Sequence, residues 1–162
     1  MQRAIIIMGS KSDAEFAEKI RSTLVSYSVM CDVRIASAHR TTEYLLGMLK
    51  EYSLLEDEIV AITVAGLSDA LSGVVAAQRL FPVVACPPDT EKLGFPKVFS
   101  SAFTPPDVPV AFVSDPVKAA NFVVQIFALS NKSLSELVEK RLKEKQNLII
   151  SEDKDFAQRK SQ

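Results

Sequence analysis

Short apolar runs alternate with amphipathic stretches along most of this chain. The apolar runs are rich in β-branched residues or alternate in polarity, as buried or half-buried strands do. Five of them are predicted as strands: residues 3–8, 31–35, 59–65, 82–86 and 108–113. Each is short enough to cross a single sheet once.

The stretches that follow these strands have apolar side chains three or four residues apart, which predicts helices. The clearest sets are Phe16, Ala17, Ile20 and Leu24; Tyr44, Leu45, Met48, Leu49 and Tyr52; and Leu71, Val74, Val75 and Leu80. Asp115-Pro116 supplies a cap and a first-turn proline for a further helix that runs to about Leu129. Regular strand and helix alternation predicts an α/β fold, a three-layer α/β/α sandwich around a central parallel sheet.

Two segments fall outside this alternation. Residues 87–107 are rich in proline and lack a clear period, so they are either an active-site cover or a subunit contact. Residues 131–162 continue as an amphipathic C-terminal helix, whose polar end from Ser151 is expected to fray. We therefore divide the chain into a catalytic domain, 1–130, and a helical segment, 131–162, that either packs on this domain or contacts another subunit.

Composition narrows the function classes. A formal net charge of −1 over 162 residues gives no field that would favour nucleic acid or a membrane surface. No apolar run reaches the length of a membrane span, and the first is too short for a signal peptide, so we expect a cytoplasmic protein. Cys31 and Cys86 are expected to be reduced, and a single histidine makes a structural zinc site improbable.

The candidate chemistry lies in the loops after the first three strands, which a parallel sheet brings to one edge. His39 is the only histidine, and it can take and return a proton near neutral pH. Arg40 beside it offers a planar fork for phosphate or carboxylate. This pair suggests proton chemistry on an anion, although a lone histidine can also be a surface or hydrogen-bonded structural residue.

The loop Gly9-Ser10-Lys11-Ser12-Asp13 is neither a Walker loop nor a Rossmann GxGxxG loop, so nucleoside triphosphates and NAD are disfavoured. Two hydroxyls at a helix N-terminus favour a single phosphate, and the Asp13 carboxylate could accept bonds from ribose hydroxyls. The alternative is that the serines only cap the helix, with Ser12 and Glu15 forming a capping box.

Three loops together resemble those of the phosphoribosylaminoimidazole carboxylases and mutases of purine biosynthesis. They are Gly9-Ser10-Lys11-Ser12-Asp13, Ser37-Ala38-His39-Arg40-Thr41, and Ala65-Gly66 followed by Leu71-Ser72-Gly73. The resemblance covers roughly residues 3–130 and implies a flavodoxin-like fold. In the third loop the mutase branch usually carries a second histidine where this chain has Ala70. The pattern is similar to the branch that uses carbon dioxide directly, although Thr104-Pro105 stands where many members have Met-Pro.

The resemblance also implies roles for individual residues. Ser12, Ser37 and Arg40 are assigned to the substrate phosphate, Ser10 and Asp13 to the ribose, and His39 to proton transfer. The pocket for carbon dioxide or the new carboxylate is assigned to the third loop. Lys11 is a candidate partner for the Asp69 carboxylate of this loop. Ala38 also belongs to the substrate-binding set. The pocket residues are Ser68, Asp69 and Ser72, and Gly66 belongs to the substrate-binding set.

The implied function is carboxylation of aminoimidazole ribonucleotide with carbon dioxide, with no metal and no cofactor, in a homo-oligomer that is a tetramer or an octamer. Two alternatives remain open from the sequence. One is a mutase that moves the carboxyl group of the corresponding carbamate. The other is a non-catalytic flavodoxin-like module that binds a nucleotide, for which the absence of tryptophan and of loop tyrosines is unfavourable because flavins usually stack on aromatic rings.

Overall fold

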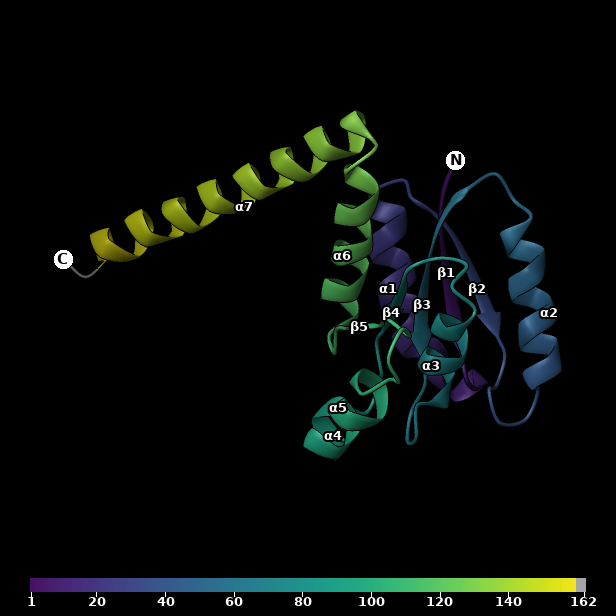
Figure 1. Ribbon diagram of the computed structural model, residues 1–162. Helices are drawn as coiled ribbons and strands as arrows, with labels where there is room; N and C mark the ends of the chain where they lie inside the picture. Colours follow the sequence, from purple (N-terminus) through teal and green to yellow (C-terminus); the bar gives the residue numbers. More distant parts are fainter. Residues whose placement is uncertain (160–162) are drawn as a thin grey trace. The chain divides into compact units, whose positions relative to one another are not determined.

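The computed structural model describes residues 1–159, which form two compact units, Met1–Val124 and Gln125 onward. The first unit contains a five-stranded sheet that is parallel throughout, in the order β2-β1-β3-β4-β5 (Figure 1). This order is the flavodoxin-like one, and it confirms the predicted fold class. The strands are β1 (Gln2–Met8), β2 (Met30–Ile35), β3 (Glu58–Val64), β4 (Val83–Ala85) and β5 (Ala111–Phe112).

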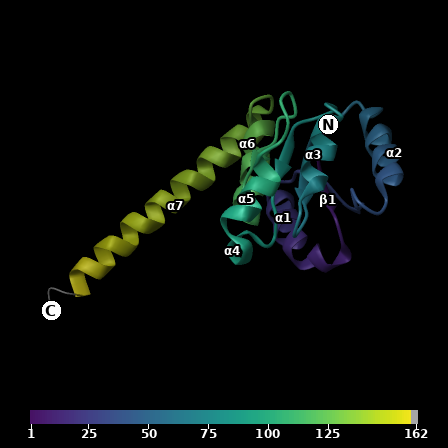
Figure 2. The same cartoon turned by 60° about the horizontal axis from the view of Figure 1, so that its bottom comes forward.

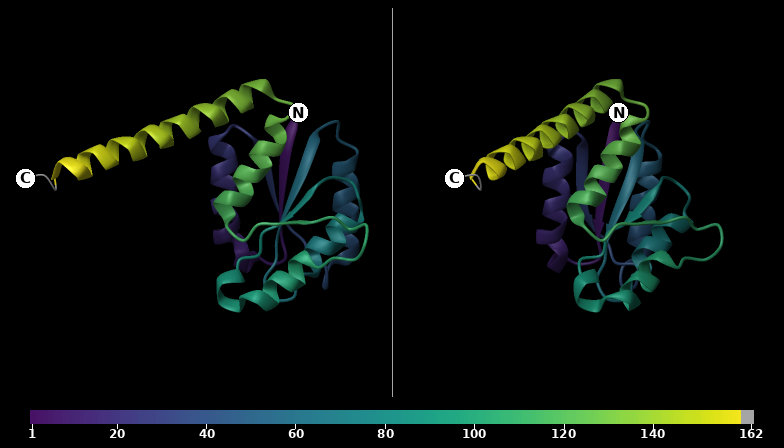
Figure 3. Two further views of the ribbon diagram at one scale, coloured as in Figure 1. Left: turned by 60° about the vertical axis from the view of Figure 1, so that its left-hand side comes forward. Right: turned by 90° about the vertical axis from the view of Figure 1, so that its left-hand side faces the viewer.

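Helices cover both faces of this sheet, as Figure 3 shows from two sides. On one face lie α1 (Ala14–Ser26) and the first part of α6 (Pro116–Ala128), and on the other lie α2 (Thr42–Ser53) and α3 (Ala70–Ala77). Successive side chains of the inner strand β1 point to opposite faces, and all of those from Ala4 to Met8 are buried. A strand that is buried on both faces explains why residues 3–8 read as a continuous apolar run.

Three helix predictions need correction. The helix predicted to include Leu80 ends at Ala77, because Arg79 has a positive φ of 53° that turns the chain. The Ser12–Glu15 capping box does not form: Ser10 caps a short 3₁₀ turn (η1, Lys11–Asp13) before α1 begins. The segment 87–107, for which no helix was expected, contains α4 (Thr90–Leu93) and α5 (Phe95–Ala102).

The start of α6 agrees with the sequence. The Asp115 carboxylate accepts a 2.7 Å hydrogen bond from the Lys118 amide, and Pro116 is the first helical residue. The second unit holds the rest of α6 and α7 (Lys132–Arg159), which stays helical well beyond the expected fraying at Ser151. None of the helices in residues 1–159 is both long and apolar enough to span a membrane.

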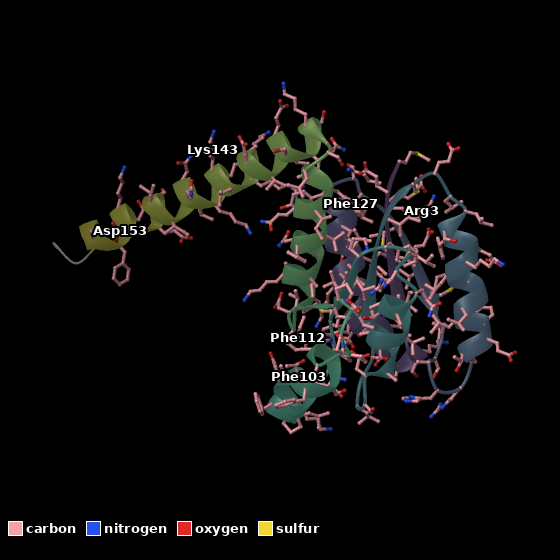
Figure 4. The ribbon with its side chains drawn as sticks, viewed as in Figure 1. Arg3, Phe103, Phe112, Phe127, Lys143 and Asp153 are labelled. Atoms are coloured by element: carbon pink, nitrogen blue, oxygen red, sulfur yellow. The ribbon has the colours of Figure 1, made fainter. Side chains whose placement is uncertain are left out.

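A charged cluster joins the ends of three strands at the edge opposite the candidate site, where Figure 4 labels Arg3. The Arg3 guanidinium donates to the carboxylates of Asp32 and Asp57, each at 2.7 Å. Its hydrogen bond holds the pKa of the Asp57 carboxyl below its ordinary value. A carboxyl whose pKa is lower in the folded state stabilises the fold above its ordinary pKa and loses that contribution at lower pH.

We predict that Asp57→Asn lowers the free energy of unfolding at neutral pH. The deficit relative to the wild type should shrink as the pH falls below 3.8, the ordinary aspartate value, because the wild-type carboxylate then becomes protonated. Urea titrations of both proteins across this pH range provide the measurement. Asp153→Asn is the matched control. A deficit that does not change with pH would show that the ionised Asp57 carboxylate is not its cause.

Candidate active site

The three predicted loops leave the sheet at the same level. Met8 pairs with Ile35 on one side and with Val64 on the other, so β1, β2 and β3 end side by side. Backbone bonds continue this alignment by one residue: the Gly9 amide donates to Val64 O and the Ala36 amide to Met8 O, both at 2.9 Å. Figure 2 brings this edge of the sheet forward.

The strand order reverses at β1, since β2 lies on one side of it and β3 on the other. In open parallel sheets, ligands bind at the carboxyl ends of the strands where the order reverses. The first and third loops diverge at this point, and the second loop begins one strand away. The sheet therefore brings the predicted loops together at the position where a ligand site is expected.

The first loop concentrates polar groups around the η1 turn. Ser10 Oγ accepts the Ser12 amide at 3.3 Å, and the Ser12 hydroxyl lies 3.1 Å from Ser10 Oγ and 3.4 Å from Asp13 Oδ1. Both serines are exposed, whereas Asp13 is partly buried. Burial raises the pKa of the Asp13 carboxyl, and the Ser12 hydrogen bond opposes this shift.

The second loop forms one hydrogen-bonded turn that leaves its reactive side chains in solvent. Ser37 Oγ accepts the Arg40 amide at 3.2 Å, and the Ser37 amide donates to Thr41 Oγ1 at 2.9 Å. Ser37 and Ala38 are partly buried, while His39 and Arg40 are exposed. Within residues 1–159 neither of these two side chains makes a hydrogen bond or an ion pair, so both are free to meet a ligand.

The third loop directs two of its predicted site residues inward. The Asp69 carboxylate accepts the Ser72 amide at 3.0 Å and the Ser72 hydroxyl at 2.5 Å, which makes Asp69 the N-cap of α3. Ser72 Oγ also lies 2.7 Å from the Thr63 hydroxyl within the sheet. Asp69 and Ser72 are buried and Ser68 is exposed, so Ser68 is the third-loop hydroxyl that solvent reaches.

The compensating partner of Asp69 is therefore Ser72 together with the N-terminus of α3. Lys11, which the sequence suggested for this role, makes no bond to Asp69 in the described chain. The Asp69 amide donates to Ser100 Oγ at 2.7 Å, so α5 also contributes to this loop.

Two site residues were missed by the sequence reasoning, and both come from the segment 87–107. Lys97 of α5 is buried and donates hydrogen bonds to the carbonyl oxygens of Ala65 and Leu67. Asp89, just before α4, accepts the Leu67 amide. A single lysine or aspartate in a proline-rich segment is usually a solvent-exposed charge, so no sequence signal marked them.

Thr104, noted as a departure from the usual pattern, lies against the third-loop helix. A Cβ added at Gly73 would meet the Thr104 methyl group at 3.8 Å, and the Thr104 hydroxyl donates to Val108 O at 2.5 Å. Within residues 1–159 there is no cluster of three His, Cys, Asp or Glu side chains that could hold a metal ion.

The chain is similar to several known proteins. A family model described as AIR carboxylase matches residues 3–147. A phosphoribosylaminoimidazole carboxylase from Archaeoglobus fulgidus is 40% identical over 95% of this chain and 84% of that protein. An N5-carboxyaminoimidazole ribonucleotide mutase from Methanocaldococcus jannaschii is 38% identical over 92% of this chain and 94% of that protein. The crystal structure of Treponema denticola PurE superimposes with a TM-score of 0.90 at 36% identity, over 96% of this chain and 98% of that one.

The buried hydrogen bonds of the third loop yield a stability prediction. Asp69→Ala removes the cap of α3 and leaves the Ser72 amide and hydroxyl without their acceptor, so we expect unfolding to become easier by about 1–2 kcal/mol. Asp69→Asn should cost less, because its amide oxygen still accepts the Ser72 amide. Thermal and urea denaturation measure both variants. Ser68→Ala is the exposed control, and an Asp69→Ala protein as stable as this control would refute the assignment.

Proposed function

Because the chain belongs to the AIR carboxylase family, we propose that it carboxylates aminoimidazole ribonucleotide with carbon dioxide, a step of purine biosynthesis. The observation that carries the proposal is the exposed, unbonded pair His39 and Arg40 in the loop after β2, a strand that ends level with β1, which leads into the Ser10 to Asp13 turn. The pair unites an acid-base group with an anion-binding group at the edge where the fold binds ligands.

The phosphate of the nucleotide is assigned to Ser12, Ser37 and Arg40. The guanidinium supplies the charge and the directed donors, and the hydroxyls of the two serines supply further donors. Ser10 and Asp13 are assigned to the ribose, where the Asp13 carboxylate accepts bonds from the sugar hydroxyls. The heterocycle then extends from the first loop toward the second and third, with Ala38 and Gly66 beside it.

The chemistry needs one proton carrier. The ring carbon next to the exocyclic amine is enamine-like, so its electron pair forms the new carbon–carbon bond to carbon dioxide, and one C=O π pair moves to oxygen as the carboxylate forms. The attacked carbon still bears its proton. The His39 imidazole removes that proton, which restores the aromatic ring, and in the reverse direction it returns the proton before carbon dioxide leaves. No step of this sequence calls on a metal or an organic cofactor.

The mutase remains the second candidate, because the Methanocaldococcus jannaschii relative bears that name. It would take the N5-carbamate of the same nucleotide and move its carboxyl group to the ring carbon. Ala70, where the mutase branch usually has a histidine, favours the carboxylase. Cytoplasmic location and assembly into a tetramer or an octamer are further parts of the proposal.

A substrate assay separates the two candidates. The purified protein is offered aminoimidazole ribonucleotide with bicarbonate as the source of carbon dioxide, and separately the carbamate in carbon-dioxide-free buffer, while ultraviolet absorbance follows the carboxylated product. We expect turnover with the first mixture and little with the second. Turnover of the carbamate alone would identify a mutase, and activity with neither would contradict both.

Two variants test the assigned roles of the second-loop side chains. His39→Asn should reduce turnover by roughly 10² to 10⁴ while nucleotide affinity changes little, because the acid-base group is lost and the phosphate contacts remain.

Arg40→Ala should mainly weaken nucleotide binding, which calorimetry with the monophosphate measures. Glu43→Gln, an exposed neighbour on α2, is the control. Near-normal turnover in His39→Asn would remove His39 from the proposed mechanism.

A further inference from the structure

Lys97 differs from every other lysine that the structure places. Its side chain is fully buried, whereas all the other lysines in residues 1–157 are exposed. Burying an ammonium group is costly unless each of its protons finds an acceptor. The contacts of Lys97 therefore indicate why this charged side chain is buried.

Three partners surround the ammonium: two backbone carbonyls accept hydrogen bonds from it, and one carboxylate oxygen lies at ion-pair distance. Lys97 Nζ lies 2.8 Å from the carbonyl oxygen of Ala65, 2.7 Å from that of Leu67 and 3.6 Å from Asp89 Oδ1. Two of the three belong to the third loop, directly after β3. The Lys97 side chain is thus bound mainly to the backbone of the third loop.

Asp89 holds the same stretch of loop from its other oxygen. Asp89 Oδ2 accepts the Leu67 amide at 2.5 Å, and a Cβ at Gly66 would approach that oxygen to 3.2 Å. Leu67 has a positive φ of 55°, a conformation that costs energy for a branched side chain and persists only when its surroundings impose it. Lys97 and Asp89 together bind both the amide and the carbonyl of Leu67.

We propose that Lys97 and Asp89 are positioning residues that fix the third loop for the carboxylation step, an inference that rests on the function proposed above. They hold Ala65 to Leu67 so that Gly66 and Ser68 line the side of the site that receives carbon dioxide. Neither touches the nucleotide phosphate, which is assigned to the first and second loops. Both charges also act on the Asp13 carboxyl, which is assigned to the ribose, but their effects on its pKa oppose each other. The pair therefore acts mainly on the chemical step and on the carbon dioxide side, and less on nucleotide affinity.

The test compares variants that remove one partner at a time. Lys97→Met removes the ammonium and keeps much of the length of the side chain, and Lys92→Met removes an exposed lysine of α4 as the matched control. We expect Lys97→Met to lower kcat with saturating nucleotide by about tenfold to hundredfold, as misplaced site groups do, while its calorimetric affinity for aminoimidazole ribonucleotide falls by a much smaller factor. Lys92→Met should match the wild type in both.

Asp89 supplies a graded second series. Asp89→Asn keeps an oxygen for the Leu67 amide but loses the ion pair, whereas Asp89→Ala loses both, so activity should fall in the order wild type, Asp89→Asn, Asp89→Ala. The double variant Lys97→Met with Asp89→Asn leaves no unpaired charge. If it regained full activity, the lysine would serve only to neutralise Asp89, and the positioning role would be wrong.

Hydrogen exchange supplies a readout that does not depend on activity. In Lys97→Met, amides of residues 65–69 should exchange faster while those of residues 9–13 and 37–42 keep their wild-type rates. Equal loss of nucleotide affinity and of kcat, or faster exchange throughout the chain, would show general destabilisation and overturn the proposal. Asp89→Asn carries the same prediction if Lys97→Met does not fold. An inactive wild type whose 65–69 amides still respond to Lys97→Met would instead contradict the proposed function.

Discussion

The site depends on the register of three parallel strands. Because Met8 pairs with both Ile35 and Val64, the loops that follow these residues start from a common level at the edge of the sheet. β1 and β3 are buried over most of their length, whereas β2 is an edge strand that is held by its ladder with β1. A slip of one residue in these ladders would send every side chain of a strand to the opposite face. The positions of His39, of the Ser10 to Asp13 turn and of the third loop thus follow from the pairing of these strands. The reactive groups themselves contribute little to holding it.

The loops differ in how they are stabilised, and the difference fits the roles that we propose for them. The second loop forms a small turn closed by its own serine and threonine, which leaves the His39 and Arg40 side chains unbonded. The third loop is held by hydrogen bonds from several elements. Ser72 bonds to it from α3. Lys97, Asp89 and Ser100 bond to it from the segment 87–107. The proposed proton carrier and phosphate ligand of the second loop need free side chains. The third loop, which is proposed to receive carbon dioxide, needs a fixed backbone instead.

Outside residues 87–107, the strand and helix order, the sheet type and the placement of the three loops at one edge followed from the sequence, because hydrophobic period and loop placement are local signals. The fine structure of the loops did not follow. Asp69 and Ser72 appear polar and available in the sequence, yet burial pairs them with each other. The contribution of residues 87–107 was missed because Lys97 meets Ala65 and Leu67 only through tertiary contact, more than 25 residues away in the chain. The positive φ of Leu67 likewise has no signal in its own residue type.

The central claim is that the His39 imidazole reaches the ring carbon of a nucleotide held by the first and second loops. A crystal structure of the protein with aminoimidazole ribonucleotide measures this most directly. We expect the phosphate beside Arg40 and Ser37, with a ring nitrogen of His39 within about 3.5 Å of the carbon to be carboxylated. A nucleotide bound elsewhere, or one whose heterocycle faces away from His39, would contradict it.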